Sequence, residues 1–160
     1  MAVDMFLKID DIKGESPDLL GHADEIQVLS WSWGMTQSGS THIGTGGGSG
    51  KVNVQDISFT KYIDLSTPNL IKMCCSGKHF KQGVLVVRKA GDKPVEYLKI
   101  KLSDLLISSV SIGAGGGEDR LTETVTLNFG KFDLDYTPQK KDGTAGSQVS
   151  VSWNIPGNTG

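Results

Sequence analysis

The sequence predicts a mainly β fold: a single-domain bent antiparallel β-barrel or sandwich with one short flanking α-helix. Apolar and polar residues alternate along most of the chain, and this period of two is typical of half-buried strands. Twenty-one glycines among 160 residues favour many turns. Helix signals gather in one short segment only. Because 160 residues suffice for one hydrophobic core but hardly for two, we expect one domain over residues 1–160.

The N-terminal third contains strands that change face. Residues 5–9 alternate cleanly, with Met5, Leu7 and Ile9 on one side. In residues 26–37 the apolar positions move from even to odd numbers after Val28, and residues 52–62 show a similar switch. Since a one-residue phase change moves side chains to the other face of a sheet, we expect a bulge or bend in each segment.

A helix is predicted over residues 66–77. Ser66 or Thr67 can cap its first turn, Pro68 fits just inside its start, and Gly77 suits a left-handed end. The positions with the spacing to pack on a sheet are Leu70, Met73 and Cys74.

The remaining strands are longer. Residues 81–89 indicate a buried strand, and residues 95–112 and 121–136 exceed the usual strand length, so both should bend. In the second of these long segments, Gly130 marks a bulge or corner because the apolar positions change parity there. Residues 113–119 and 139–147 are predicted loops. The last strand places its apolar residues on one face: Val149, Val151, Trp153 and Ile155.

The glycine-rich segment HIGTGGGSGKV, residues 42–52, resembles a phosphate-binding loop but fails as one. The first glycine of that motif would fall on Thr45, and the hydroxyl residue that follows the lysine is replaced by Val52. A strand pattern follows, so no helix N-terminus is available for a phosphate. We interpret residues 38–51 as an extended hairpin loop.

Other chemistry is weakly indicated. The three histidines and two adjacent cysteines, Cys74 and Cys75, lack metal-ligand spacing, and small buried core residues are the favoured interpretation of the cysteines. Trp31, Trp33 and Trp153 are expected to pack in the core rather than form a sugar platform. We expect no cofactor and no catalytic residue. The net charge of −2 disfavours nucleic acid, and the N-terminus carries neither a signal peptide nor a membrane span.

Charge is unevenly distributed. Residues 1–25 hold seven acids against two lysines, whereas residues 78–101 hold seven basic residues against two acids. These segments form either two solvated surfaces or complementary patches that meet between subunits.

Several segments together carry a family resemblance: MAVDMFLKIDDIKGES, HADEIQVLSWSWG, KVNVQDISFTKYIDLSTPNL, KAGDKPVEYLKIKL and GGEDRLTETVTLNF. In this order, from residue 1 to about 139, they resemble the haemolysin-coregulated protein (Hcp) family, the tube protein of bacterial type VI secretion.

The resemblance implies a structural protein rather than an enzyme. It implies hexameric rings that stack into a tube, a contractile sheath and baseplate around it, a spike protein of the VgrG type at its tip, and effector proteins in its lumen. The tube would assemble in the cytoplasm and then be secreted without a signal peptide. Alternatives are a cytoplasmic β-barrel binding module for a small ligand or carbohydrate, or a thiol- or nucleotide-dependent enzyme.

The hypothesis assigns roles to named residues. If Trp31 and Trp33 face the core, Ser30 and Ser32 face the opposite way, and they are the candidates for effector contact in the lumen. The subunit-interface candidates are Asp24, Glu25, Lys78, Lys81, Lys99 and Lys101. The ring-stacking or spike-contact candidates are His42, Gly44, Thr45, Gly46, Gly47, Gly48, Ser49, Gly50 and Lys51.

Shortening the loop at residues 42–51 is expected to leave hexamers intact but to weaken stacked tubes, because the loop would lose its reach toward the next ring. Negative-stain imaging of rings and tubes at matched protein concentration measures both. Tubes of undiminished length from the shortened chain would contradict this role.

Overall fold

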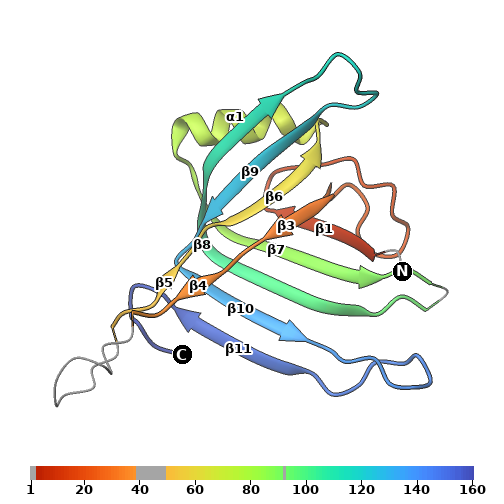
Figure 1. The fold of residues 1–160 in the computed structure, drawn as a ribbon, viewed down its shortest axis with the longest axis vertical. Helices are drawn as coiled ribbons and strands as arrows, with labels where there is room; N and C mark the ends of the chain where they lie inside the picture. Colours follow the sequence, from red (N-terminus) through yellow and green to blue (C-terminus); the bar gives the residue numbers. More distant parts are fainter. Residues whose placement is uncertain (1–2, 39–49, 92) are drawn as a thin grey trace.

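The computed structural model describes residues 3–38, 50–91 and 93–160. It confirms a mainly β fold with a helix on its flank (Figure 1). In chain order the elements are β1 (Val3–Ile9), β2 (Ile26–Gln27), β3 (Ser30–Ser32), β4 (Met35–Thr36), β5 (Asn53–Val54), β6 (Ile57–Tyr62), α1 (Ser66–Ser76), β7 (His79–Lys89), β8 (Glu96–Gly113), β9 (Thr122–Asn128), β10 (Lys131–Tyr136) and β11 (Val149–Asn154).

All strand pairs are antiparallel. A nine-stranded sheet follows the order β2-β1-β7-β8-β9-β6-β3, with β10 also paired to β8 and β11 paired to β10. A separate pair, β4 and β5, leads into and out of the segment at residues 39–49. The phase changes predicted within residues 26–37 and 52–62 coincide with the breaks between β2 and β3 and between β5 and β6.

The sheet bends along a line that crosses β7, β8 and the segment between β9 and β10. On β8, buried residues occupy even positions at Ile100 and Leu102 but odd positions at Leu105 and Ile107. Between them Asp104 has φ of 53°, a left-handed conformation that Asp tolerates better than most residues. The pairing of β8 with β9 and β10 keeps one register across this point, where Gly130 lies. The corner predicted at Gly130 is confirmed, and its left-handed residue lies on the partner strand.

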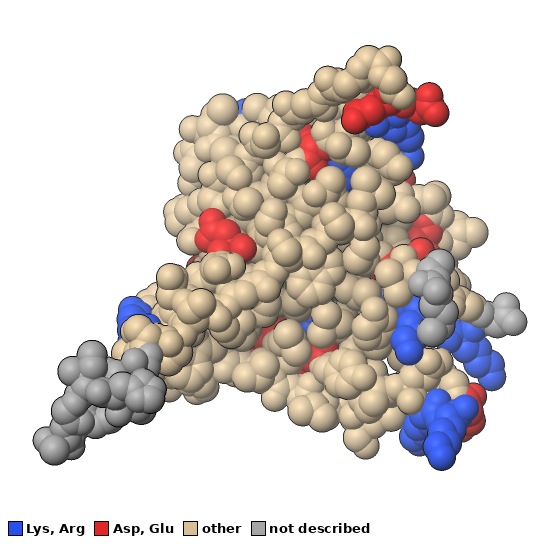
Figure 2. Space-filling view, viewed as in Figure 1, with Lys and Arg blue, Asp and Glu red and all other residues tan. Residues whose placement is uncertain are grey.

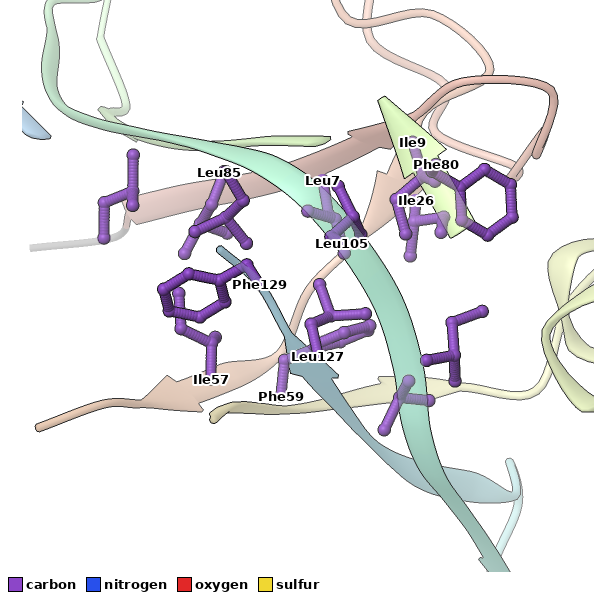
Figure 3. Close-up of a cluster of buried hydrophobic side chains, with 14 of the residues drawn as sticks. Leu7, Ile9, Ile26, Ile57, Phe59, Phe80, Leu85, Leu105, Leu127 and Phe129 are labelled. Atoms are coloured by element: carbon purple, nitrogen blue, oxygen red, sulfur yellow. The ribbon is translucent and has the colours of Figure 1, made fainter. Parts of the chain in front are cut away.

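The bend folds the sheet over a continuous hydrophobic core. Side chains from β1, β2, β6, β7, β8 and β9 point toward one another (Figure 3). Leu70 of α1 is fully buried, and Met73 and Cys74 pack against the same cluster, as the helix pattern predicted. The tryptophans also pack on this core, each partly buried.

The start of α1 differs from the prediction. Ser66 and Thr67 do not cap the helix from outside; both lie within its first turn and are buried. Asp64 caps the helix instead, because its Oδ1 accepts a hydrogen bond of 2.8 Å from the backbone N–H of Ser66. The end agrees with the prediction, since Gly77 has φ of 66° and donates its N–H to the carbonyl of Cys74.

One burial prediction was wrong, and one apolar face that the sequence predicted is left uncovered. Cys75 is exposed and Cys74 half-buried, because only one of two neighbouring helix positions can face the core. On β11, Trp153 packs on the core, but Val149 and Val151 are exposed, since the β10–β11 hairpin extends beyond the layer that would cover them.

A charged pair is buried beneath the start of α1. Lys61 on β6 and Glu123 on β9 face each other across the strands, both side chains are fully buried, and they form an ion pair. Lys61 Nζ also reaches Asp64 Oδ1 at 3.0 Å, and Thr67 Oγ1 donates to Glu123 Oε1 at 2.8 Å. These contacts tie the helix N-terminus to two strands.

Lys61→Met is expected to destabilise the fold by about 3–5 kcal/mol, because it leaves Glu123 buried without its cation. The double variant Lys61→Met with Glu123→Leu should recover most of this loss, since no uncompensated charge remains. Urea unfolding followed by fluorescence measures both. A double variant less stable than Lys61→Met would contradict this explanation.

Candidate assembly surfaces

The side of the sheet opposite the core carries a continuous array of hydroxyl side chains, here called the hydroxyl face. It spans β3, β6, β9 and the second half of β8. Strand register aligns its members in two rows, Ser30–Thr60–Thr124–Ser111 and Ser32–Ser58–Thr126–Ser109. All eight are exposed or half-buried.

The side chains of the hydroxyl face are short and mostly uncharged. Core-facing neighbours such as Phe59 and Val125 are buried, so the rows lie on the outer side of these strands. Ser109 and Thr126 share a hydrogen bond at 2.7 Å, and at the margin Ser108 donates to Asp56 at 2.6 Å. Few charged side chains lie over β3, β6 and β9 in Figure 2.

The structure places Ser30 and Ser32 at the edge of this face. Both are exposed, and Trp31 between them packs toward the core, as the alternation predicted. Sequence reasoning missed the other six members. Their signal was present as Ser and Thr on the polar positions of residues 58–60, 109–111 and 124–126, but only the strand register shows that they align.

The predicted basic patch is not of one sign on the strand where two of its lysines lie. Lys99 and Lys101 on β8 stand opposite Asp135 and Asp133 on β10. Glu25 accepts a hydrogen bond from a nearby histidine rather than projecting outward. Four of the six candidates are exposed, namely Asp24, Lys78, Lys81 and Lys99.

The histidine that contacts Glu25 is His22, which holds the loop between β1 and β2 against the sheet. Its ring stacks on Phe6 with centroids 4.5 Å apart, Nδ1 lies 2.9 Å from Glu25, and Nε2 contacts Glu96. Burial alone would lower the pKa of His22, but the hydrogen bonds to Glu96 and Glu25 outweigh it and raise that pKa above the ordinary value.

A second ion pair holds the same loop. Arg88 on β7 is buried and reaches Asp18 Oδ1 at 2.6 Å and Oδ2 at 3.2 Å. This hydrogen-bonded guanidinium, together with backbone N–H donors from His22 and Leu20, lowers the pKa of Asp18 to about 2. The contacts of His22 with Glu25 and Glu96 are here called the His22 clasp. Neither this clasp nor the Arg88–Asp18 ion pair was predicted from the sequence, because the partners are up to 74 positions apart.

Most of the proposed stacking loop lies outside the described residues, namely His42, Gly44, Thr45, Gly46, Gly47, Gly48 and Ser49. Gly50 and Lys51 are described. A Cβ on Gly50 would lie 2.4 Å from Ser38 Oγ, so the base of the loop is closed tightly. Lys51 is exposed.

Within residues 3–38, 50–91 and 93–160, no group of three or more His, Cys, Asp or Glu side chains is arranged to hold a metal ion. The described helix is too short and polar to cross a membrane.

Comparison with known proteins identifies the family. A family model described as "Type VI secretion system effector, Hcp" matches residues 6–136. The chain belongs to the Hcp family. It is 64% identical to protein hcp1 of Pseudomonas aeruginosa over 157 residues, which cover 97% of this chain and 96% of that protein.

Solved structures agree with this assignment. The crystal structure of Hcp1 from Salmonella typhimurium shares 41% identity, with a TM-score of 0.82 and 99% coverage of both chains. The structure of another type six secretion system protein shares 30% identity, with a TM-score of 0.91 and the same coverage. As an Hcp protein, this chain is a secreted structural component of the type VI secretion system rather than an enzyme.

The His22 clasp makes stability depend on pH. Because the folded-state pKa of His22 is raised, its contribution is complete below the unfolded-state pKa near 6.5 and is lost as pH rises through the folded value. The melting temperature should therefore fall as pH rises from about 6 to 8.

His22→Gln should flatten this dependence, while His79→Gln, at an exposed histidine, should leave it unchanged. Thermal denaturation followed by circular dichroism at matched ionic strength measures all three proteins. An equal slope for His22→Gln and the unmodified chain would contradict the clasp.

Proposed function

We propose that this Hcp protein forms head-to-tail hexameric rings that stack into the inner tube, and that its hydroxyl face lines the lumen in which effector proteins are carried. The proposal rests chiefly on one observation: eight serine and threonine residues align across four strands on one side of the sheet. Membership in the Hcp family supports the tube assignment.

The chemistry of the hydroxyl face suits a channel for varied cargo. Each hydroxyl both donates and accepts hydrogen bonds, so it can contact peptide groups and polar side chains of many proteins. The scarcity of charge prevents selection by the net charge of the cargo. The side chains are short, so they leave the channel wide.

The edges of the sheet supply a route to ring closure. Among the described strands β3 pairs only with β6, and β8 from Ile107 onward pairs only with β9. Unpaired strand edges in a stable protein are normally covered or paired. Placing the β3 edge of one copy beside the β8 edge of the next extends both hydroxyl rows, and a repeated rotation closes the ring.

Other partners follow from the tube role. The sheath and baseplate would surround the tube, a spike of the VgrG type would sit at its tip, and assembly in the cytoplasm would precede secretion. The segment at residues 38–51, which emerges from β4 and β5, is assigned to ring stacking or spike contact. Asp24, Lys78 and Lys81 remain candidates for contact between subunits.

The purified chain is expected to form rings of uniform diameter in negative-stain images. Within these rings Ser32→Trp should leave the hexamer intact but reduce the amount of co-purifying effector protein by at least about tenfold, because six indoles would obstruct the channel. Quantitative mass spectrometry of isolated rings measures this amount.

Ser150→Trp is the matched control, since Ser150 is exposed on β11 outside the hydroxyl face and should have no effect. Normal effector content in Ser32→Trp rings would refute the lumen assignment. A monomer that binds a small ligand or carbohydrate would refute the tube role altogether.

A further inference from the structure

Two apolar patches on the core-facing side of the sheet lie uncovered. The first, here called the hairpin patch, is on β10–β11 and consists of Tyr136, Val149 and Val151, which are 47%, 66% and 53% exposed. The second, the distal patch, lies at the far end of the β8–β9 hairpin and consists of Ile112 and Leu121, at 48% and 41%.

Both patches continue the core rather than the outer surface. Tyr136 pairs with Val149, and Leu134 pairs with Val151 on the same side of the hairpin as the core residue Phe132. At the other end Ile112 pairs with the buried Glu123. Each patch therefore extends the core-facing side of the sheet but remains exposed to solvent in the single chain.

Charged turns of opposite sign follow the two patches. Beyond the hairpin patch the turn carries Lys140 and Lys141, and beyond the distal patch it carries Glu118 and Asp119, all exposed. Figure 2 shows acidic side chains with basic ones beside them at the tip of β8–β9, and mainly basic ones at the tip of β10–β11.

Charges of the opposite sign in these turns have contacts in their own chain. Arg120 lies over the ring of Tyr62 at 3.8 Å, and Asp142 accepts hydrogen bonds from Thr144. Arg120 and Asp142 are exposed as well, but each has a partner in its own chain, so the acidic pair of one turn and the lysine pair of the other remain for contact with a neighbour.

We propose that in the ring the hairpin patch of one copy packs against the distal patch of the next, with Lys140 and Lys141 beside Glu118 and Asp119. This contact rests on the head-to-tail ring proposed above and names the surfaces that meet. Such a ring requires two different, complementary surfaces on each copy. These patches match in polarity along their length, apolar against apolar and acidic tip against basic tip.

The arrangement of the hairpins allows this contact. Both hairpins end on the same side of the molecule, at the right of Figure 1. A neighbour whose β8 edge lies beside β3 is displaced toward β10 and β11, so its β8–β9 hairpin extends across the uncovered hairpin patch. The occupant of each patch is thus a second copy of this chain.

Charge reversal tests the contact without disturbing the core. Glu118→Lys with Asp119→Lys, or Lys140→Glu with Lys141→Glu, should raise the concentration at which half of the rings dissociate by about tenfold or more, because like charges then face each other. All four substitutions together should restore the original value. Analytical ultracentrifugation across a dilution series measures this midpoint.

Lys8→Glu with Lys13→Glu is the matched control, because it reverses two exposed lysines on another surface and should not move the midpoint. The proposed contact is wrong if neither charge reversal changes this midpoint concentration. It is also wrong if the fourfold variant dissociates at as high a concentration as the less stable of the two double variants. Either result would leave the ring proposal intact. If the unmodified chain forms no ring, both proposals are wrong.

Covalent trapping provides a second measurement. With Cys74→Ser and Cys75→Ser as background, Val149→Cys together with Leu121→Cys should form disulfides between neighbours and give a ladder up to six chains on a non-reducing gel. Each single cysteine alone should give no ladder. Intact rings without any ladder from the double cysteine chain would overturn the contact.

Discussion

The bend across β7, β8 and the β9–β10 segment is the constraint on which the rest of the molecule depends. It is made without inserting a residue, since the strand register is the same on both sides of Asp104. A left-handed residue within a strand reverses which side chains face inward. One 18-residue strand can therefore serve two layers, with its first half beside β7 and β10 and its second half beside β9.

Once the sheet is bent, the chemistry of its outer sides is separated. On one side of the bend the outward positions carry mixed charges, such as Lys101 opposite Asp133. On the other side they carry the hydroxyl face. The buried pair of Lys61 and Glu123 lies behind that face and joins α1 to it, so the hydroxyl rows rest on a layer held by packing and by an ion pair.

The sequence predicted the elements well because alternation reports burial strand by strand. It located the breaks before β3 and at Gly130 and the left-handed end of α1 at Gly77. It could not show which strands are neighbours. For that reason the hydroxyl rows and the contact between His22 and Glu96 were missed, and the alternation in the last strand did not reveal that no layer covers Val151.

The exposure of Val149 and Val151 is informative because it contradicts the pattern that surrounds it. Alternation is normally selected by water on one side and a core on the other, so an apolar side that meets water in the single chain indicates a missing partner. An edge strand with such a side also invites unspecific pairing. A closed ring of the kind proposed above would cover the apolar side of β11 with a neighbouring copy and would pair the free edges of β3 and β8. In the proposed ring, the exposed apolar side of β10–β11 becomes part of a hydrophobic core shared between neighbouring copies rather than a packing defect.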